Sequence, residues 1–387
     1  GADGVAMLVR ALKSSPGLRY LGLRETRAGA DGVESVAQAL PQWETLTDLD
    51  VTSNWADLDQ VGSLANLGVC TALRRLAIGS NFSGDTGVQL LAAAIVRCSS
   101  LEEVNMSNCQ MSCGQFCVMA DAIPRCRRLA SLRVDGNMVG SRTDSMVTGH
   151  RIARLVQQCT ALAELHVELQ NEGLTALGEN LSLNYTLTHL SVSSKNFVTS
   201  EGVKALCTGL PQFPRLTRLD WTLGSRMVQG PNPGSFQSPD LAEAVVWLHN
   251  SLRHLNVEQS RLGSPGAVAL AAGIWTCAAL ETINVSGNQI ADDGMLALGG
   301  AMEGCVELTR LDLSKNVAGD RGGEELAGLL LKCCPRLEVL DVRDNRFSDA
   351  AAERMRGVLT ARTRLVALID RTDKGGARPV PSSWSSL

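Results

Sequence analysis

The 387-residue sequence has no excess of positive charge, because 36 Lys and Arg are set against 40 Asp and Glu. A net charge of −4 argues against a nucleic-acid-binding protein, which needs a basic surface to neutralise phosphates. Aromatic residues are also few (6 Phe, 6 Trp and 2 Tyr), which disfavours surfaces that stack on bases. No apolar run approaches the roughly 18 residues of a membrane span, so we expect no insertion into a membrane.

Recognisable catalytic motifs are missing as well. The sequence has no P-loop, no G-x-S-x-G, no H-E-x-x-H and no dinucleotide-binding fingerprint. We therefore predict a protein that is not an enzyme and uses no cofactor. No signal peptide is visible at the start, where Gly1 stands in place of an initiator Met. Targeting cannot be judged from this start. Since the twelve cysteines are expected to be free thiols, which suit a reducing compartment, we expect an intracellular, cytoplasmic location, with a cytoskeletal, ciliary or organellar one as the alternative.

A repeated pattern, L-x-x-L-x-L with aliphatic substitutes, runs along nearly the whole chain. It begins at Leu18, Leu46, Leu73, Leu101, Leu129, Leu162, Leu187, Leu216, Leu252, Leu280, Leu308, Leu337 and, in a decayed form, Leu365. Most starts are 27 to 29 residues apart, and the exceptional spacings of 33, 25 and 36 residues lie between Leu129 and Leu252. The alternation within the pattern is typical of a short strand with one buried face.

The second half of each unit carries apolar residues at helical spacing, as in ADGVESVAQAL from Ala30 and GDTGVQLLAAAI from Gly84. Asp or Ser near the start of these segments suits a helix N-terminus. Neither half can bury its apolar face alone, so the units must stack. We predict an α/β fold over residues 1–369: one right-handed solenoid with a parallel sheet on its concave face and helices on its convex face.

The two ends differ from the middle. The segment ADGVAMLVRAL from Ala2 copies the later helices, so the chain opens in mid-repeat, without an N-terminal cap. We expect twelve full units, a partial unit before Leu18 and a degraded strand near Leu365. Residues 370–387 are polar, rich in Pro, Gly and Ser, and unpatterned, and we interpret them as a C-terminal tail.

Over residues 1–369 the chain resembles the leucine-rich repeat proteins. Units of 28–29 residues with a full helix and a D-x-G-x-x-x-L-A element resemble the ribonuclease-inhibitor subtype. A Cys three residues before the strand pattern, as in CPRLEVL from Cys334, resembles the cysteine-containing repeats of F-box substrate receptors. The resemblance implies a horseshoe that holds a protein ligand on its concave face or rim, and it specifies fold far more closely than function.

Asn and Cys residues also recur at fixed places in the repeat. An Asn often stands eight residues after the pattern start, where its amide can bond the turn that leaves the strand; these residues are Asn54, Asn81, Asn137, Asn288, Asn316 and Asn345. Seven of the twelve cysteines stand three residues before the pattern: Cys70, Cys98, Cys126, Cys159, Cys277, Cys305 and Cys334. We interpret them as buried, reduced core residues rather than disulfides. Cys109, Cys113 and Cys117 allow a zinc interpretation, but no CxxC pair supports it.

Three of the five histidines fall on outward-facing strand places, which are the third, fifth and seventh of each pattern. Glu164 and Glu168 flank His166, and His189 lies on the next strand, so these four side chains are expected to converge. Two imidazoles and two carboxylates could bind a metal. We favour a polar contact surface over a metal site, and we predict no metal. All concave places together carry ten acids and six arginines, a mixed and mildly acidic face suited to protein recognition.

Two units carry insertions, one around Ser141–His150 and one over Gly224–Asp240. Insertions between repeats commonly form loops on one face, often a binding face, although lengthening a surface loop also costs little stability. Met227 and Phe236 in the second insertion are candidate anchors for a partner pocket. The predicted partner-binding residues are Glu164, His166, Glu168, His189, Arg218, Asp220, Met227, Phe236, His254 and Glu258.

Three functions remain open at this stage. The first is a non-catalytic scaffold that binds a protein partner through the concave face and the rim insertions. The second is a GTPase regulator, since leucine-rich repeat proteins that activate the Ran GTPase share this subtype, although the acidic C-terminal stretch of that family is missing here. The third is a structural subunit of a large assembly, such as a ciliary axoneme or an organellar complex.

Overall fold

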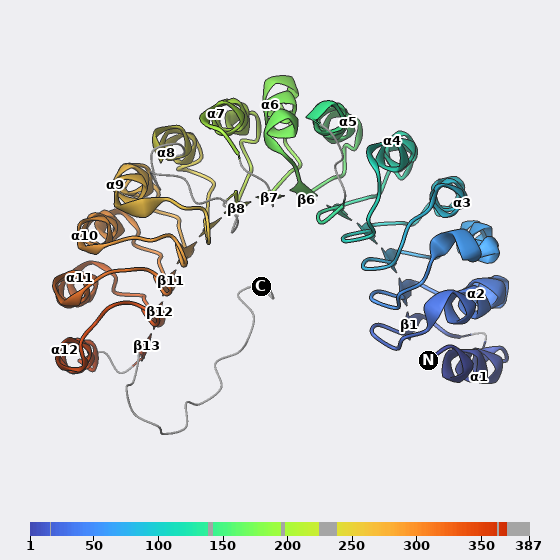
Figure 1. The fold of residues 1–387 in the computed structure, drawn as a ribbon, viewed down its shortest axis with the longest axis horizontal. Coiled ribbons are helices and arrows are strands. Elements are labelled where there is room, and N and C mark those ends of the chain that lie inside the picture. Colours follow the sequence, from blue (N-terminus) through green and yellow to red (C-terminus); the bar gives the residue numbers. More distant parts are fainter. Residues whose placement is uncertain (16, 138–141, 195–197, 224–237, 362–363, 370–387) are drawn as a thin grey trace.

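The computed structural model describes residues 1–15, 17–137, 142–194, 198–223, 238–361 and 364–369. The chain forms an arch in which the strands line the inner curve and the helices cover the outer curve (Figure 1). The two halves of each unit therefore occupy opposite faces, as the alternating and helical patterns predict. Among the described residues, no helix combines the length and the apolar character needed to cross a bilayer.

All described strands belong to one parallel sheet, in which each strand pairs with its neighbours in the sequence. The strands are β1 (Tyr20–Gly22), β2 (Asp48–Asp50), β3 (Arg75–Ala77), β4 (Glu103–Asn105), β5 (Ser131–Arg133), β6 (Glu164–Glu168), β7 (His189–Ser193), β8 (Arg218–Thr222), β9 (His254–Asn256), β10 (Thr282–Asn284), β11 (Arg310–Asp312), β12 (Val339–Asp341) and β13 (Val366–Leu368). The predicted α/β horseshoe is confirmed by this thirteen-stranded order of the described chain.

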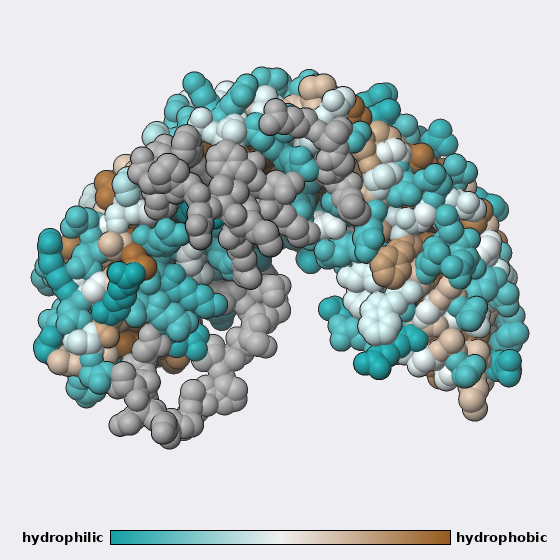
Figure 2. Space-filling model, in the orientation of Figure 1, coloured by the Kyte–Doolittle hydropathy of each residue, from teal (hydrophilic) through white to brown (hydrophobic). Residues whose placement is uncertain are grey.

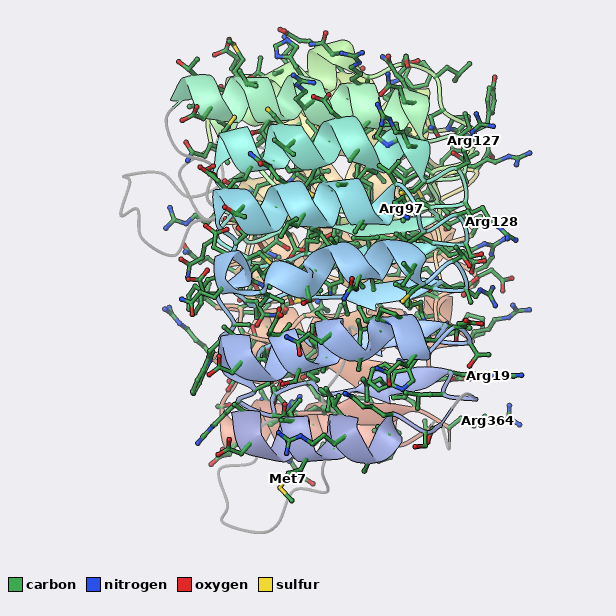
Figure 3. All side chains as sticks on the ribbon, turned by 90° about the vertical axis from the view of Figure 1, so that its right-hand side faces the viewer. Met7, Arg19, Arg97, Arg127, Arg128 and Arg364 are labelled. Atoms are coloured by element: carbon green, nitrogen blue, oxygen red, sulfur yellow. The ribbon has the colours of Figure 1, made fainter. Side chains whose placement is uncertain are left out.

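The helices stack side by side along the convex face (Figure 3). They are α1 (Ala2–Leu12), α2 (Gly29–Ala39), α3 (Asp85–Ile95), α4 (Cys113–Ala122), α5 (Arg142–Gln158), α6 (Asn171–Asn180), α7 (Ser200–Gly209), α8 (Ser238–Trp247), α9 (Gly263–Ile274), α10 (Asp292–Ala301), α11 (Asp320–Cys333) and α12 (Asp349–Leu359). Short 3₁₀ turns follow several of them: η1 (Leu40–Gln42), η4 (Ile123–Arg125), η5 (Leu210–Gln212) and η6 (Met302–Gly304). Arg97, Arg127 and Arg128 lie along the edge where the chain passes from helix to strand (Figure 3).

The core is a single layer between sheet and helices. In the strand units from β2 to β12 the first, fourth and sixth places are buried, as Leu46, Leu49 and Val51 show for β2. These residues belong to one continuous apolar cluster that extends from Val5 in α1 to Ile369 after β13. Burial of apolar surface is the main stabilising term, and stacking the units supplies it along the whole arch.

The predicted Asn register is a row of buried amides that joins successive units. Asn288 shows the pattern: its Nδ2 donates to the backbone oxygens of Val257 at 2.8 Å and Val285 at 2.9 Å. Its Oδ1 accepts from the backbone N–H groups of Ser260 at 2.8 Å and Leu262 at 3.3 Å. Backbone groups of two adjacent turns, which would otherwise be buried without partners, are thereby satisfied.

The seven register cysteines are buried, and all twelve cysteines of the chain are unpaired thiols. The Cys98 thiol donates to the backbone oxygen of Leu67, at the end of the preceding unit's convex segment, at 3.2 Å. Trp43 and Asn184 fill the same place in other units and make the same bond, Nε1 to Leu12 O at 3.1 Å and Nδ2 to Val156 O at 3.0 Å. In these units the place thus holds a side chain that donates to the preceding unit, whereas in the unit of β8 it holds the apolar Phe213.

The Asp and Ser residues that were expected to suit the helix N-termini act in two ways. Ser112 and Ser348 do cap their own helices. Asp292 at the start of α10 instead accepts from the backbone N–H of Gly319, the residue before α11, at 2.6 Å. Gly322 is needed beside it, because a Cβ there would lie 2.6 Å from Asp292 Oδ1. The D-x-G element thus bonds one repeat to the next.

Three details of the predicted units are wrong. Between β2 and β3 the chain forms two 3₁₀ helices, η2 (Leu58–Gln60) and η3 (Gly62–Val69), in place of an α-helix. The insertion placed around residues 141–150 is no loop from residue 142 onward, because Arg142–Gln158 is helical. The last unit begins one residue earlier than predicted, since Leu340 pairs with Ala367 and the first place is therefore Arg364.

Candidate protein-binding surface

The concave face is formed by the outward-facing side chains of the strands. In β6 exposure alternates, so Glu164, His166 and Glu168 face the inside of the arch while Leu165 and Val167 are buried. The same alternation recurs in β7 (His189–Ser193). The inside of the arch is open, and much of the visible surface is hydrophilic (Figure 2). The apolar core is formed by the buried places, and the concave places carry polar residues that are available to a partner.

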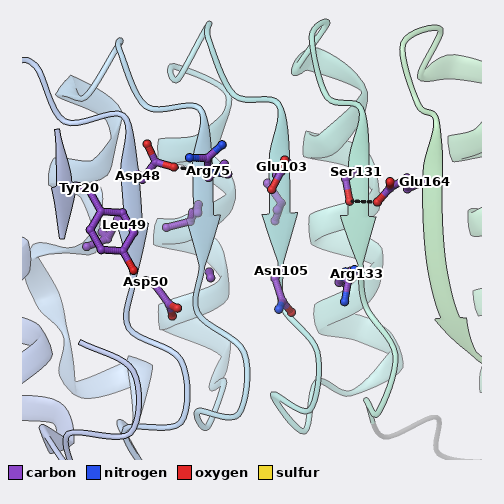
Figure 4. A pocket seen from close by; sticks show the side chains of 13 residues that line it. Tyr20, Asp48, Leu49, Asp50, Arg75, Glu103, Asn105, Ser131, Arg133 and Glu164 are labelled. Atoms are coloured by element: carbon purple, nitrogen blue, oxygen red, sulfur yellow. Dashed lines mark hydrogen bonds and ion pairs between the residues drawn. The ribbon is translucent and has the colours of Figure 1, made fainter. Parts of the chain in front are cut away.

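A hollow of about 440 Å³ lies on the concave face over β1 to β6. Its polar lining consists of Tyr20, Asp48, Asp50, Arg75, Glu103, Asn105, Ser131, Arg133 and Glu164 (Figure 4). Within it Arg75 forms an ion pair with Asp48, and the Ser131 hydroxyl donates to Glu164 Oε2 at 3.1 Å. This hollow adds the first five strands to the surface, which the sequence prediction had placed only from Glu164 to Glu258.

A second group of polar side chains lies at the centre of the sheet, on β6, β7 and β8. The His166 and His189 rings meet edge to face, with centroids 4.6 Å apart. His189 Nε2 lies 2.7 Å from Asp220 Oδ2, and Arg218 Nε donates to the same oxygen at 3.0 Å. Glu164 is the register partner of His189 on the neighbouring strand. We call Glu164, His166, His189, Arg218 and Asp220 the central cluster.

The surroundings of the central cluster shift its protonation equilibria. Burial, together with the nearby Arg133 and His189, lowers the pKa of His166 to about 3. Burial by itself would raise the pKa of Asp220, but the hydrogen bond from His189 and the charge of Arg218 outweigh it and lower that pKa. At neutral pH the cluster therefore contains a neutral His166 imidazole and an ionised Asp220 carboxylate.

Further along the sheet, Asp312 on β11 is buried and Asp341 lies beside it on β12. Burial, followed by the charges of Asp341 and Glu258, raises the pKa of Asp312, against the hydrogen bonds from Ser314 that lower it. Asp341 is paired with Arg343, whose Nη2 lies 2.5 Å from Oδ2. Asp312 Oδ1 accepts the backbone N–H of Ser314 at 2.9 Å, a bond that a neutral amide makes at the same place in β10, where Asn284 accepts from Ser286. The bond therefore does not require a carboxylate, and a buried carboxylate beside a second one costs stability.

Comparison with known proteins places these features in a family. The family model described as Leucine Rich repeat matches four segments, residues 183–207, 249–271, 276–299 and 305–327. These segments contain strands and helices of the horseshoe described above. The chain is a leucine-rich repeat protein. Its units are of the ribonuclease-inhibitor-like kind, and the ribonuclease inhibitor of Sus scrofa is 28% identical over 210 residues, or 52% of this chain and 44% of that protein.

Other relatives show how far the likeness extends. The Tonsoku-like protein of Bos taurus is 29% identical over 225 residues, which make up 55% of this leucine-rich repeat chain and 16% of the bovine protein. The chain thus matches less than half the length of either curated relative. An internalin from Listeria monocytogenes aligns over 96% of the chain and 95% of its own, at 16% identity and a TM-score of 0.43, which is too loose to add to the assignment.

The predicted binding residues of this leucine-rich repeat protein fall into three groups. Glu164, His166, His189, Arg218 and Asp220 come together as the central cluster. Glu168 does not join them as predicted; it sits farther along β6, and its carboxylate accepts from the backbone N–H of Gly136 at 3.1 Å. His254 and Glu258 lie on the next repeat, where His254 Nδ1 is 3.0 Å from Thr282 Oγ1 and Glu258 Oε2 accepts from Asn284 at 3.3 Å. Met227 and Phe236 lie outside the described residues.

Proposed function

We propose that this leucine-rich repeat protein is a non-catalytic scaffold that holds a protein partner on its concave face. The observation that carries the proposal is the sheet itself. Thirteen parallel strands present a continuous row of side chains which the core does not require, and many of those side chains are charged. Contacts made by successive repeats add together on such a surface, which suits an extended protein partner.

The charge of the surface indicates the kind of partner. The acids Asp50, Glu103, Asp312 and Glu258 spread along the arc from β2 to β11. Asp312 Oδ1 accepts the backbone N–H of Ser314, yet burial and the neighbouring carboxylates raise the pKa of Asp312, so its negative charge is present on this face at a cost in stability. We infer that the partner presents basic side chains to the concave face. The ribonuclease inhibitor of Sus scrofa is, by its name, an inhibitor of another protein, which agrees with a protein partner.

The location that we propose is a reducing compartment of the cell. Twelve unpaired thiols, nine of them buried, support it, because such a cysteine content would be exposed to oxidation during secretion. The rim insertion at Gly224–Asp240 is proposed as an additional contact on the evidence of its sequence alone.

The test is a capture experiment with charge-matched variants of the full chain. The concave variant Asp50→Lys, Glu103→Lys, Glu258→Lys is compared with the convex variant Glu179→Lys, Glu201→Lys, Glu243→Lys, whose three residues are exposed on α6, α7 and α8. Both variants change the net charge equally. We expect proteins captured by the wild type to be lost, by about tenfold or more, only with the concave variant. Equal capture by the wild type and the concave variant would refute the proposal.

The insertion is tested separately by deleting Gln229–Ser238. If the deletion variant shows a wild-type circular dichroism spectrum and captures each partner at full strength, the insertion has no part in binding. The concave-face proposal is unaffected by that result, because the strands retain their side chains.

A further inference from the structure

Three potential ligand side chains come together within the central cluster. Glu164 and His166 are contributed by β6 and His189 by β7, and one donor atom from each lies within 4.8 Å of the others. The pairing of Glu164 with His189 across adjacent strands fixes this neighbourhood through the backbone register. Rigid strands are better supports for such a site than loops are.

His166 has an unused ring nitrogen. Its Nε2 is buried, and no protein hydrogen-bond partner meets it among the described residues. Buried polar atoms are nearly always paired, because leaving one unpaired costs about 1–3 kcal/mol. The neighbouring His189 ring approaches His166 edge to face and does not remove this cost. A ligand that accepts the lone pair of His166 Nε2 would remove this cost.

His189 is held in one orientation by a carboxylate. Its Nε2 lies 2.7 Å from Asp220 Oδ2, and Asp220 is fixed in turn by Arg218. A carboxylate that bonds one imidazole nitrogen sets the tautomer and leaves the lone pair on the other nitrogen, here Nδ1. Metal-binding histidines in proteins are commonly oriented by such an outer carboxylate. Asp220 also balances the positive charge of Arg218, which would otherwise repel a cation.

We propose that Glu164, His166 and His189 bind a divalent transition-metal ion of the zinc class, with Asp220 as the positioning residue for His189. Two imidazoles and one carboxylate suit zinc and its neighbours better than magnesium or calcium, which prefer oxygen ligands alone. Ligands of a tetrahedral zinc ion lie about 3.3 Å apart, so the donor atoms close by up to about 1.5 Å on binding. Side-chain rotation accommodates this closure on an open sheet face.

The site is independent of the proposed scaffold function and reaches beyond it. Three protein ligands leave one position of a tetrahedral ion open. On the concave face that position points to the space where a partner would lie, so the ion offers a further point of attachment. The loss of metal binding and the loss of partner capture are separate measurements, since the charge variants described above leave the three ligands intact.

The test is isothermal titration of the purified, chelator-treated full chain with ZnCl₂ under reducing conditions. The wild type is expected to bind one ion through the site. His166→Gln and Glu164→Gln should each weaken that binding by at least about tenfold, and Asp220→Asn by about 10- to 100-fold. His254→Gln is the matched control: His254 is a concave, half-buried histidine outside the cluster, and its replacement should leave the affinity unchanged.

Cobalt binding separates this site from the thiols. Co²⁺ at the proposed site should show visible bands without the near-ultraviolet charge-transfer band of thiolate ligands. Circular dichroism of each variant checks that a loss of binding is not a loss of fold. The proposal is overturned if the wild type binds no zinc, if His166→Gln and Glu164→Gln bind as the wild type does, or if the bound cobalt carries thiolate ligands.

Discussion

Replacing Asn288 by Ala tests the row of buried amides. The Asn288 side chain is fully buried and makes three short bonds, to Val257 O, Val285 O and Ser260 N. A further bond to Ser286 O is 3.1 Å long and one from Leu262 N is 3.3 Å. At about 1 kcal/mol for each short bond, and with little added by the longer ones, the free energy of unfolding should fall by about 3 kcal/mol.

Ser260→Ala supplies an internal comparison. Ser260 fills the same place one repeat earlier and is also fully buried, but its Oγ makes one short bond, to Trp221 O at 2.8 Å. Its removal should lower the free energy of unfolding by about 1 kcal/mol. The two variants therefore differ in the number of bonds removed while burial and position in the repeat stay the same.

Urea unfolding followed by circular dichroism gives the global values. Because repeats contact only their neighbours, local opening can precede global unfolding. Hydrogen exchange of the Ser260 and Leu262 amides, which bond Asn288 Oδ1, therefore provides a local readout and should accelerate in Asn288→Ala. If Asn288→Ala costs no more than Ser260→Ala, or less than about 1 kcal/mol, the amide row contributes little and the reasoning is wrong.

Three further predictions concern thiols and carboxylates. Thiol titration of the native protein at pH 8 should label at most Cys113, Cys117 and Cys333, which are only partly buried, and labelling of more than half the cysteines before unfolding would contradict the structure. Cys98→Ser should lower the free energy of unfolding by about 1–3 kcal/mol in urea titration, because burial disfavours the hydroxyl, and Cys98→Ala should show whether the bond to Leu67 O matters. Asp312→Asn should raise the unfolding midpoint at pH 7. A raised carboxyl pKa means that ionisation on folding costs stability, so the advantage of Asn should shrink as the pH falls below that pKa and the wild-type carboxyl becomes protonated. A midpoint that falls at pH 7 would contradict this.

The repeat made the fold predictable to a large extent. Apolar residues at fixed places, such as Leu46, Leu49 and Val51, set the strand, the buried face and the spacing to the next unit. The prediction was wrong in two units, in which the local sequence is compatible with more than one structure or alignment. The segment after β2 was expected to be an α-helix like those of the other units, yet it forms two 3₁₀ helices. The decayed final pattern could be aligned in two ways, and only the pairing of Leu340 with Ala367 decides between them.

The site was less predictable, because it depends on side-chain geometry across strands. Strand register alone is enough to place Glu164 beside His189, and that neighbourhood was predicted. The spacing of 29 residues places His189 opposite Arg218, as observed, but the side chain of His189 bonds diagonally to Asp220, a choice that strand register does not specify. The competing partner that draws Glu168 away is a backbone N–H, that of Gly136, which no sequence pattern marks. The unpaired nitrogen of His166 likewise depends on its neighbours in space.

The sequence of the middle units lacks the register Asn, and this has a mechanical consequence. Asn54, Asn81 and Asn137 serve the first units and Asn288, Asn316 and Asn345 the last, whereas the sequence places Gln170, Lys195 and Gly224 between them. In this region the pairs β6–β7 and β7–β8 extend over five residues each, whereas the other described strand pairs extend over three. The arch thus has two arms, in which side-chain amides join successive turns, and a joint between them that is held by the pairing of the strands. We expect its gap to widen or narrow at that joint, so that the two arms can grip partners of different width with the same residues.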